Sequence, residues 1–93
     1  MLVIVKSAPD TPEGKMGITM AKDVSANLVL LQNAVYFALK NNLEGLSGTV
    51  YALEDDLRLR GLKNDDLKGD IKKLNYDGLI DLMVEDDRVM GIF

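Results

Sequence analysis

Three short apolar runs constrain the fold of this chain more than any other feature. They cover residues 2–5, 27–31 and 50–53, and each carries apolar side chains at nearly every position rather than at every second one. Strands that are apolar on both faces are typical of parallel sheets, in which helices cover both sides. The three runs are therefore predicted to be buried strands of a parallel sheet.

A helix is predicted between the first two runs. Thr11 is placed to cap it and Pro12 to be its first residue, where the missing N–H of proline costs nothing. Met16, Met20 and Val24 recur every four residues and predict its apolar face. Two glycines inside this segment are expected to weaken the helix.

Two further helices are predicted around the third run. The first covers residues 34–43 and is expected to be capped by Asn33. The second begins at Glu54 or Asp55, one of which is expected to cap it, and stops at Gly61. Helices and strands thus continue to alternate along the chain, which is the pattern of an α/β protein.

The C-terminal part extends the same alternation. Residues 64–66 are predicted to form a helical turn, residues 70–74 a weak strand and residues 88–92 a final edge strand. An apolar set at spacing i, i+3, i+4, i+7 predicts a helix between the two strands: Tyr76, Leu79, Ile80 and Met83. The expected fold is a single α/β domain over residues 1–93. It is a three-layer α/β/α sandwich with a mainly parallel sheet of about five strands.

Polar residues gather where the predicted strands end, and ligands of such sheets bind at those ends. The candidate strand-end surface consists of Lys6, Ser7, Gln32, Asn33, Asp55 and Asp56. The acids after residue 53 could hold a metal ion or accept a phosphoryl group, but a phospho-receiver also needs an acid pair after the first strand. Acids in the first turn of a helix are stabilised by its positive end, so we expect these acids to begin a helix.

The predicted helix over residues 34–43 begins with six consecutive apolar residues. A helix that is apolar all round is buried all round, whereas a helix of a small three-layer domain exposes one side. Another subunit could cover that side, since Tyr and Phe are enriched at the cores of interfaces. The candidate subunit interface consists of Val35, Tyr36, Phe37 and Leu39.

Composition narrows the possible functions. The chain has no Cys, His or Trp, which removes disulfides, thiolate and imidazole nucleophiles and the usual zinc sites. Its net charge of −4 arises in residues 54–93, which hold seven bases and eleven acids. Without a basic stripe we expect no direct binding of nucleic acid. No apolar run reaches the ~20 residues of a membrane helix, so we expect a cytoplasmic protein. The sequence gives no basis for a bound cofactor.

Three stretches together resemble one family: LVIVKSAP at residues 2–9, LVLLQNAVY at residues 28–36 and VYALEDDLRLRGL at residues 50–62. In this order and spacing they are similar to the DsrH/TusB family of small sulfur-relay subunits. The resemblance continues more weakly through YDGLIDL at residues 76–82 and covers most of the chain. The block over residues 50–62 is its most specific part.

The resemblance implies a DsrE/DsrF/DsrH-like fold and assembly with related subunits, either as a homo-oligomer or with DsrE/DsrF or TusC/TusD-like chains. The family's context is persulfide transfer, in 2-thiolation of the tRNA wobble uridine or in sulfur oxidation. A subunit that carries sulfur itself needs a Cys, and this chain has none. We therefore expect a non-catalytic subunit that scaffolds or orients a Cys-bearing partner.

Two other functions are consistent with the sequence. One is a stand-alone homo-oligomer that binds a small ligand or a protein at the strand ends. The other is an enzyme that uses Lys6, Asp55 and Asp56, because proton transfer by carboxylates needs no His. The first would form a stable oligomer without Cys-bearing homologues, and the second would lose its turnover when the two aspartates become asparagines.

Overall fold

A computed structural model describes residues 1–39, 43, 45–67 and 69–92 of the chain. Its centre is a five-stranded sheet in the order β4-β3-β2-β1-β5, and every neighbouring pair of strands is parallel. The predicted parallel sheet of about five strands is confirmed. The strands are β1 (Leu2–Val5), β2 (Asn27–Leu30), β3 (Val50–Leu53), β4 (Lys72–Leu74) and β5 (Val89–Ile92).

Burial follows the order of the strands in the sheet. The central strands β1 and β2 and most of β3 are buried, as their continuous apolar runs predict. The edge strands are more exposed: β4 carries two exposed lysines, and β5 is exposed at three of its four positions. The predicted edge position of the last strand, β5, is correct. The lysines of the other edge strand, β4, discourage pairing with other chains.

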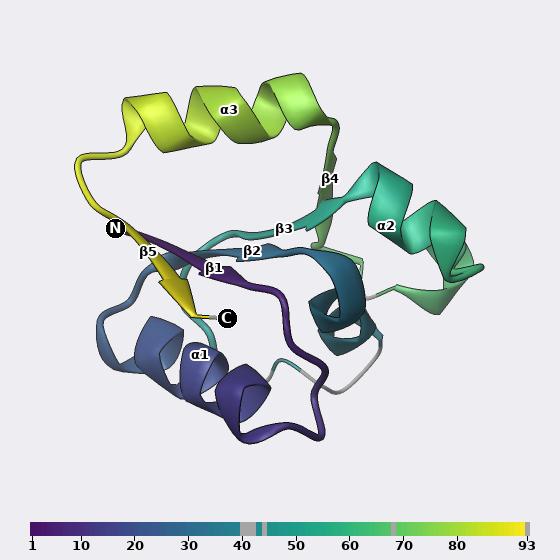
Figure 1. Cartoon of the computed structure of the whole chain (residues 1–93), viewed down its shortest axis with the longest axis horizontal. Helices are drawn as coiled ribbons and strands as arrows, with labels where there is room; N and C mark the ends of the chain where they lie inside the picture. Colours follow the sequence, from purple (N-terminus) through teal and green to yellow (C-terminus); the bar gives the residue numbers. More distant parts are fainter. Residues whose placement is uncertain (40–42, 44, 68, 93) are drawn as a thin grey trace.

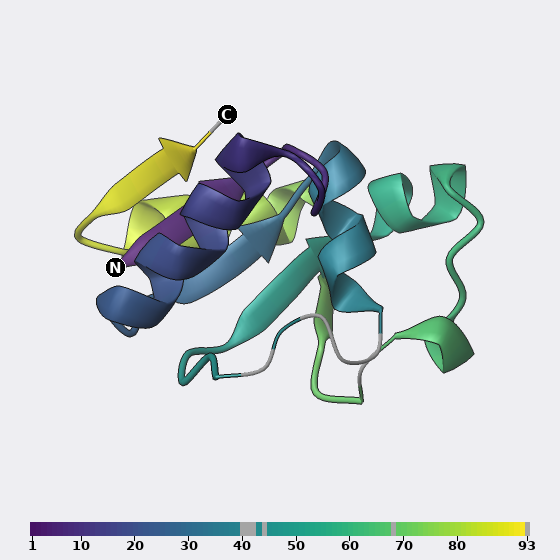
Figure 2. The same cartoon turned by 90° about the horizontal axis from the view of Figure 1, so that it is seen from below.

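The connections between strands fix the layers. The chain moves from β1 to β4 in one direction across the sheet, then returns past β1 to β5. Right-handed crossovers therefore place α1 (Pro12–Asp23) and the 3₁₀ helix η1 (Gln32–Ala38) on one face and α3 (Tyr76–Glu85) on the other. Figures 1 and 2 show this sandwich, with α2 (Glu54–Leu59) beyond the carboxyl end of β3 and followed by η2 (Asn64–Asp66).

Helix α1 begins as predicted but packs on a different face. The Thr11 side chain accepts a hydrogen bond from the Gly14 N–H at 3.0 Å, and Pro12 is the first helical residue. The buried positions are Gly14, Gly17, Ile18 and Ala21, whereas Met16 and Val24 are exposed and Met20 is half-buried. The predicted apolar face is real but faces outward, because the glycines let the other side approach β1.

The segment predicted as an α-helix over residues 34–43 is instead a 3₁₀ helix that ends at Ala38, and residues 40–42 lie outside the described part. Its N-cap is Leu31, so the expected cap at Asn33 is wrong. With about three residues per turn, side chains three positions apart are eclipsed. Two such pairs are buried and form two rows that face the core: Ala34 with Phe37, and Val35 with Ala38. Tyr36 lies in a third row and is only half-buried.

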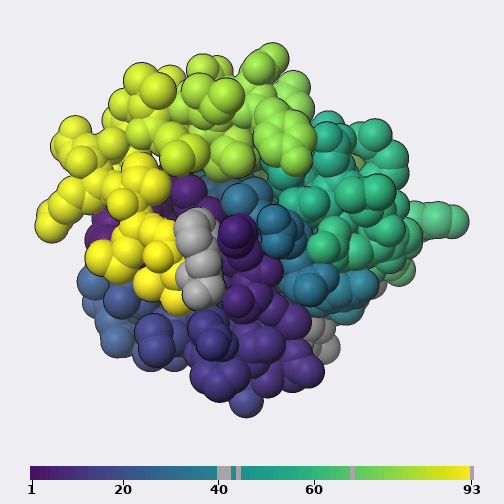
Figure 3. All heavy atoms as spheres, in the orientation of Figure 1, coloured from purple at the N-terminus to yellow at the C-terminus, as the bar shows by residue number. Residues whose placement is uncertain are grey.

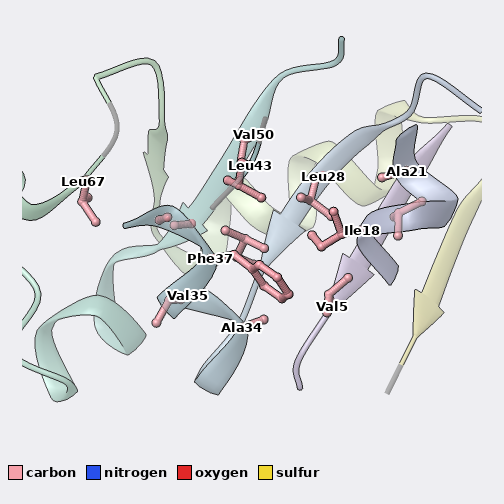
Figure 4. Close-up of a cluster of buried hydrophobic side chains, with 14 of the residues drawn as sticks. Val5, Ile18, Ala21, Leu28, Ala34, Val35, Phe37, Leu43, Val50 and Leu67 are labelled. Carbon is pink, nitrogen blue, oxygen red and sulfur yellow. The ribbon is translucent and has the colours of Figure 1, made fainter. Parts of the chain in front are cut away.

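Two hydrophobic clusters lie on the two faces of the sheet. The larger one joins α1, η1 and the strands, and Figure 4 shows Phe37 pointing into it beside Leu28 and Ile18. The smaller one contains Leu2, Ile4, Val29, Leu53 and Leu79. Leu79 is the one buried residue of α3, so α3 covers its face of the sheet thinly.

Candidate functional site

The carboxyl ends of β1, β2 and β3 meet at one edge of the sheet, where hydrogen bonds connect the loops that follow them. The Leu31 N–H donates to the Val5 carbonyl at 2.9 Å, and the Ala34 N–H donates to the Lys6 carbonyl at 3.2 Å. Ser7 is half-buried, and its carbonyl lies against Gly14 of α1. The predicted strand-end residues therefore share one edge of the sheet, and polar contacts made by the α2 segment join three of them.

Asp56 is the buried centre of this edge. It is the third residue of α2 and only 7% exposed, and its Oδ2 accepts a hydrogen bond from the Gln32 N–H at 2.7 Å. Gln32 has a φ of +49°, a left-handed conformation that is uncommon for a residue with a side chain. The Asp56 carboxylate thus holds the turn between β2 and η1 in place and satisfies its backbone donor.

Arg60 completes the cluster from the other end of α2. Its Nη1 donates to the Asp56 carbonyl at 3.1 Å and lies 3.7 Å from Oδ1 of the same residue, while its Nε donates to the Asn33 Oδ1 at 3.1 Å. The sequence predicts Arg58 and Arg60 alike on the exposed side of the helix. This is correct for Arg58, whose side chain is 73% exposed, and wrong for Arg60, whose side chain is 19% exposed. The i, i+4 spacing of Asp56 and Arg60 could have revealed the pair.

The three consecutive acids diverge. Glu54 lines a surface hollow, Asp55 pairs with Arg58 and Asp56 faces Gln32. In the described part of the chain, no cluster of three or more acids, histidines or cysteines is arranged to hold a metal ion. All three residues occupy the first turn of α2, so the interpretation of these acids as the start of a helix is correct.

A hollow of about 350 Å³ lies beside α2. Charged, amide and leucine side chains line it, and the Lys73 ammonium contacts the Asn64 side chain. The lining residues are Glu54, Leu57, Arg58, Leu62, Lys63, Asn64, Leu67 and Lys73. Three cations and one acid give this hollow a positive charge balance, which suits an anionic rather than a cationic group.

Replacing Asp55 by alanine should change the free energy of unfolding by less than about 0.5 kcal/mol. The N-cap of α2 is Leu53, so the expected cap at Asp55 or Glu54 is wrong. Asp55 forms an exposed ion pair with Arg58 at 3.1 Å, and such pairs contribute little. Urea denaturation of the variant measures the change. A loss above about 1 kcal/mol would show that this carboxylate does cap the helix.

The residues predicted to form a subunit interface occupy different environments. Val35 and Phe37 are buried within the chain itself, so they need no partner to cover them. Tyr36 and Leu39 are half-buried in the outward row of the segment, and Leu39 forms a β-bridge with Leu67. A subunit contact through Tyr36 and Leu39 stays a prediction.

The sequence does not predict a group of exposed apolar side chains on α3. In this helix Tyr76, Ile80, Met83 and Val84 are all exposed. The i, i+3, i+4, i+7 spacing of Tyr76, Leu79, Ile80 and Met83 correctly predicts the helix, but of these four only Leu79 is buried. Spacing identifies an apolar face without saying whether the chain's own core covers it.

The chain is similar to known proteins over most of its length. The family described as DsrH like protein matches residues 15–89. Protein TusB of Buchnera aphidicola subsp. Baizongia pistaciae (strain Bp) is 30% identical over 96 residues, which cover 98% of this chain and 99% of that protein. Within the described residues, no helix is both long enough and apolar enough to cross a bilayer.

Two solved structures share the fold. The solution structure of protein Tm0979 from Thermotoga maritima has a TM-score of 0.70 and 34% identity, over 95% of this chain and 97% of that chain. The crystal structure of the ychN protein from E. coli has a TM-score of 0.73 and 18% identity, over 97% of both chains. The expected three-layer α/β sandwich is thus found in both similar structures.

Proposed function

The chain belongs to the DsrH family, and from this membership we propose that it is a non-catalytic subunit of a sulfur-relay complex. In this proposal it orients a Cys-bearing partner subunit during persulfide transfer, in tRNA wobble-uridine 2-thiolation or in sulfur oxidation. Its partners are DsrE/DsrF or TusC/TusD-like chains, and it works in the cytoplasm.

The absence of cysteine carries this proposal. Persulfide sulfur is received by a thiolate, which attacks the donor and retains the sulfur atom. None of the 93 residues is a cysteine, and the five methionine thioethers have no S–H to give up. A member of the family with this composition contributes to a relay through its surface rather than through its own sulfur chemistry.

The strand-end geometry supports the same role. The carboxylate of Asp56 and the guanidinium of Arg60 are engaged in fixing the loop after β2. Within the described residues, every buried side-chain nitrogen and oxygen has a hydrogen-bond partner. Such an edge is a rigid surface for a partner's reactive loop, and rigid elements position reacting groups well.

Native mass spectrometry of the tagged chain, purified from its own cells, tests this function. We expect a hetero-oligomer in which at least one companion chain is a Cys-bearing homologue. Persulfide labelling should then modify the companion and leave this chain unlabelled. A homo-oligomer or monomer without such a companion would contradict the proposal. That result would favour a stand-alone ligand-binding protein, with the hollow beside α2 as the first place to search.

A further inference from the structure

Helix α3 presents an apolar stripe to the outside of the molecule. Val84 is 79% exposed, Tyr76 and Ile80 are each 56% exposed, and Met83 is 42% exposed. We call these four residues the α3 stripe. Single exposed apolar side chains are ordinary, but a contiguous group of large ones marks an interaction site.

The stripe is contiguous because of helical geometry. At about 100° per residue, Tyr76, Ile80, Met83 and Val84 fall within one sector of the helix, beside Leu79, which faces the sheet. A second sector holds only acids: Asp77, Asp81 and Glu85. Around the helix the order is therefore sheet-facing side, apolar stripe, acidic row.

Nothing else in the described chain packs over the outer side of α3. Figure 3 shows α3 along the upper margin of the molecule, with no other segment beyond it. It is the one described helix on its face of the sheet, and Leu31, Tyr51 and Leu74 beneath it are only partly buried. A partner seated on the α3 stripe would therefore bury apolar side chains that the described chain leaves exposed.

Charge decides what kind of partner fits. Helix α3 contains no Lys or Arg between Tyr76 and Glu85, and Lys73 of β4 turns instead to Asn64. Two copies of the chain joined through antiparallel α3 helices would bring their acidic rows together, and like charges across an interface cost affinity. A partner with Lys or Arg beside an apolar surface would instead be attracted to the row.

We propose that the α3 stripe docks the Cys-bearing partner subunit, through an apolar surface of that subunit bordered by Lys or Arg. This inference deepens the proposed function and depends on it. The stripe supplies the apolar core of the contact, and Asp77, Asp81 and Glu85 form its charged rim. The α3 face thus holds the partner, while the strand-end edge is left to face the partner's reactive loop.

A matched pair of charge substitutions tests the surface. Ile80→Glu places a carboxylate in the α3 stripe, and Met16→Glu places one on α1, on the opposite face of the sheet. Both positions are 56% exposed, and each is the fifth residue of its helix. In both helices the third residue is a glycine whose N–H donates a hydrogen bond to the N-cap side chain. Both variants should fold, as thermal unfolding will show.

The tagged chain and both variants would be purified from the native cells and weighed as intact complexes. Ile80→Glu should lower the recovery of the Cys-bearing companion by about tenfold or more, as expected for a charge in the core of an interface. Met16→Glu should recover it like the wild type. Full recovery with Ile80→Glu, or equal loss in both variants, would overturn the α3 assignment and leave the proposed function standing.

The charged rim has its own test. The triple variant Asp77→Asn, Asp81→Asn, Glu85→Gln keeps the shape of α3 and removes three charges. Its affinity for the isolated companion should fall by about tenfold and should depend less on salt between about 0.05 and 0.5 M. Unchanged affinity would contradict the proposal that Lys or Arg residues of the partner border the contact. A wild-type chain that yields only a homo-oligomer would overturn both this inference and the proposed function.

Discussion

Replacing Asp56 by alanine should lower the free energy of unfolding by about 3 kcal/mol. The substitution removes the acceptor of the Gln32 N–H, in a turn whose φ of +49° is already unfavourable. It also removes the carboxylate 3.7 Å from the Arg60 guanidinium, which is largely buried. Urea denaturation at fixed protein concentration measures the loss.

Two comparisons separate the anchoring role of Asp56 from its charge. Asp56→Asn keeps an oxygen that can accept from Gln32, so it should cost about half as much as the alanine variant. Arg60→Met should destabilise less in the Asp56→Ala background than in the wild type, because the two side chains interact directly. If Asp56→Ala costs no more than Asp55→Ala, the carboxylate does not hold the turn.

The acids after β3 show what sequence can and cannot predict about this edge. Their position at the start of a helix follows from chain order and from the preference of acids for the first turn. Their separate roles do not, because Asp55 and Asp56 differ only in the direction in which the helix points each side chain. That direction turns Asp55 toward Arg58 and Asp56 toward a loop 24 residues away.

The sheet was predictable because its signal is local. Each central strand is an apolar run, and the alternation of strands with helices leaves a parallel sheet as the simple solution. The 3₁₀ conformation of η1 was harder to predict from the sequence. Six consecutive apolar residues predict a helix buried all round, whereas a three-residue period buries two rows of side chains and leaves Tyr36 in a third.

Helices α1 and α3 show a second limit of prediction from apolar spacing. In α1 and in α3, apolar residues at helical spacing lie largely on the exposed side. In α1 three of the four buried residues are Gly or Ala, and at Gly17 the helix approaches β1 too closely for a side chain. Apolar periodicity therefore predicts helices reliably here, while the size of the side chains decides which face meets the sheet.

Replacing Gly17 by alanine should accordingly destabilise the chain by about 2 kcal/mol, although alanine is the better helix former by about 1 kcal/mol. An added Cβ would lie 2.4 Å from Cγ2 of Val5, which is fully buried in the central strand. The helix or the strand would have to move, and a close-packed core resists such a shift. The loss of unfolding free energy in urea is the measurement.

A double-mutant cycle of Gly17→Ala with Val5→Ala identifies the cause of this loss in stability. Val5→Ala alone should cost about 2–3 kcal/mol, since it leaves a cavity under α1. In the double variant the new methyl group of residue 17 fills the space left by the valine methyls, so the two losses should partly cancel rather than add.

Gly69→Ala, whose Cβ would meet nothing within 4 Å, is the control and should be nearly neutral. Additive losses in the cycle would mean that Val5 is not what excludes a side chain at position 17. A neutral Gly17→Ala would mean that α1 can withdraw from β1, and close contact would then not be the reason for its glycine face.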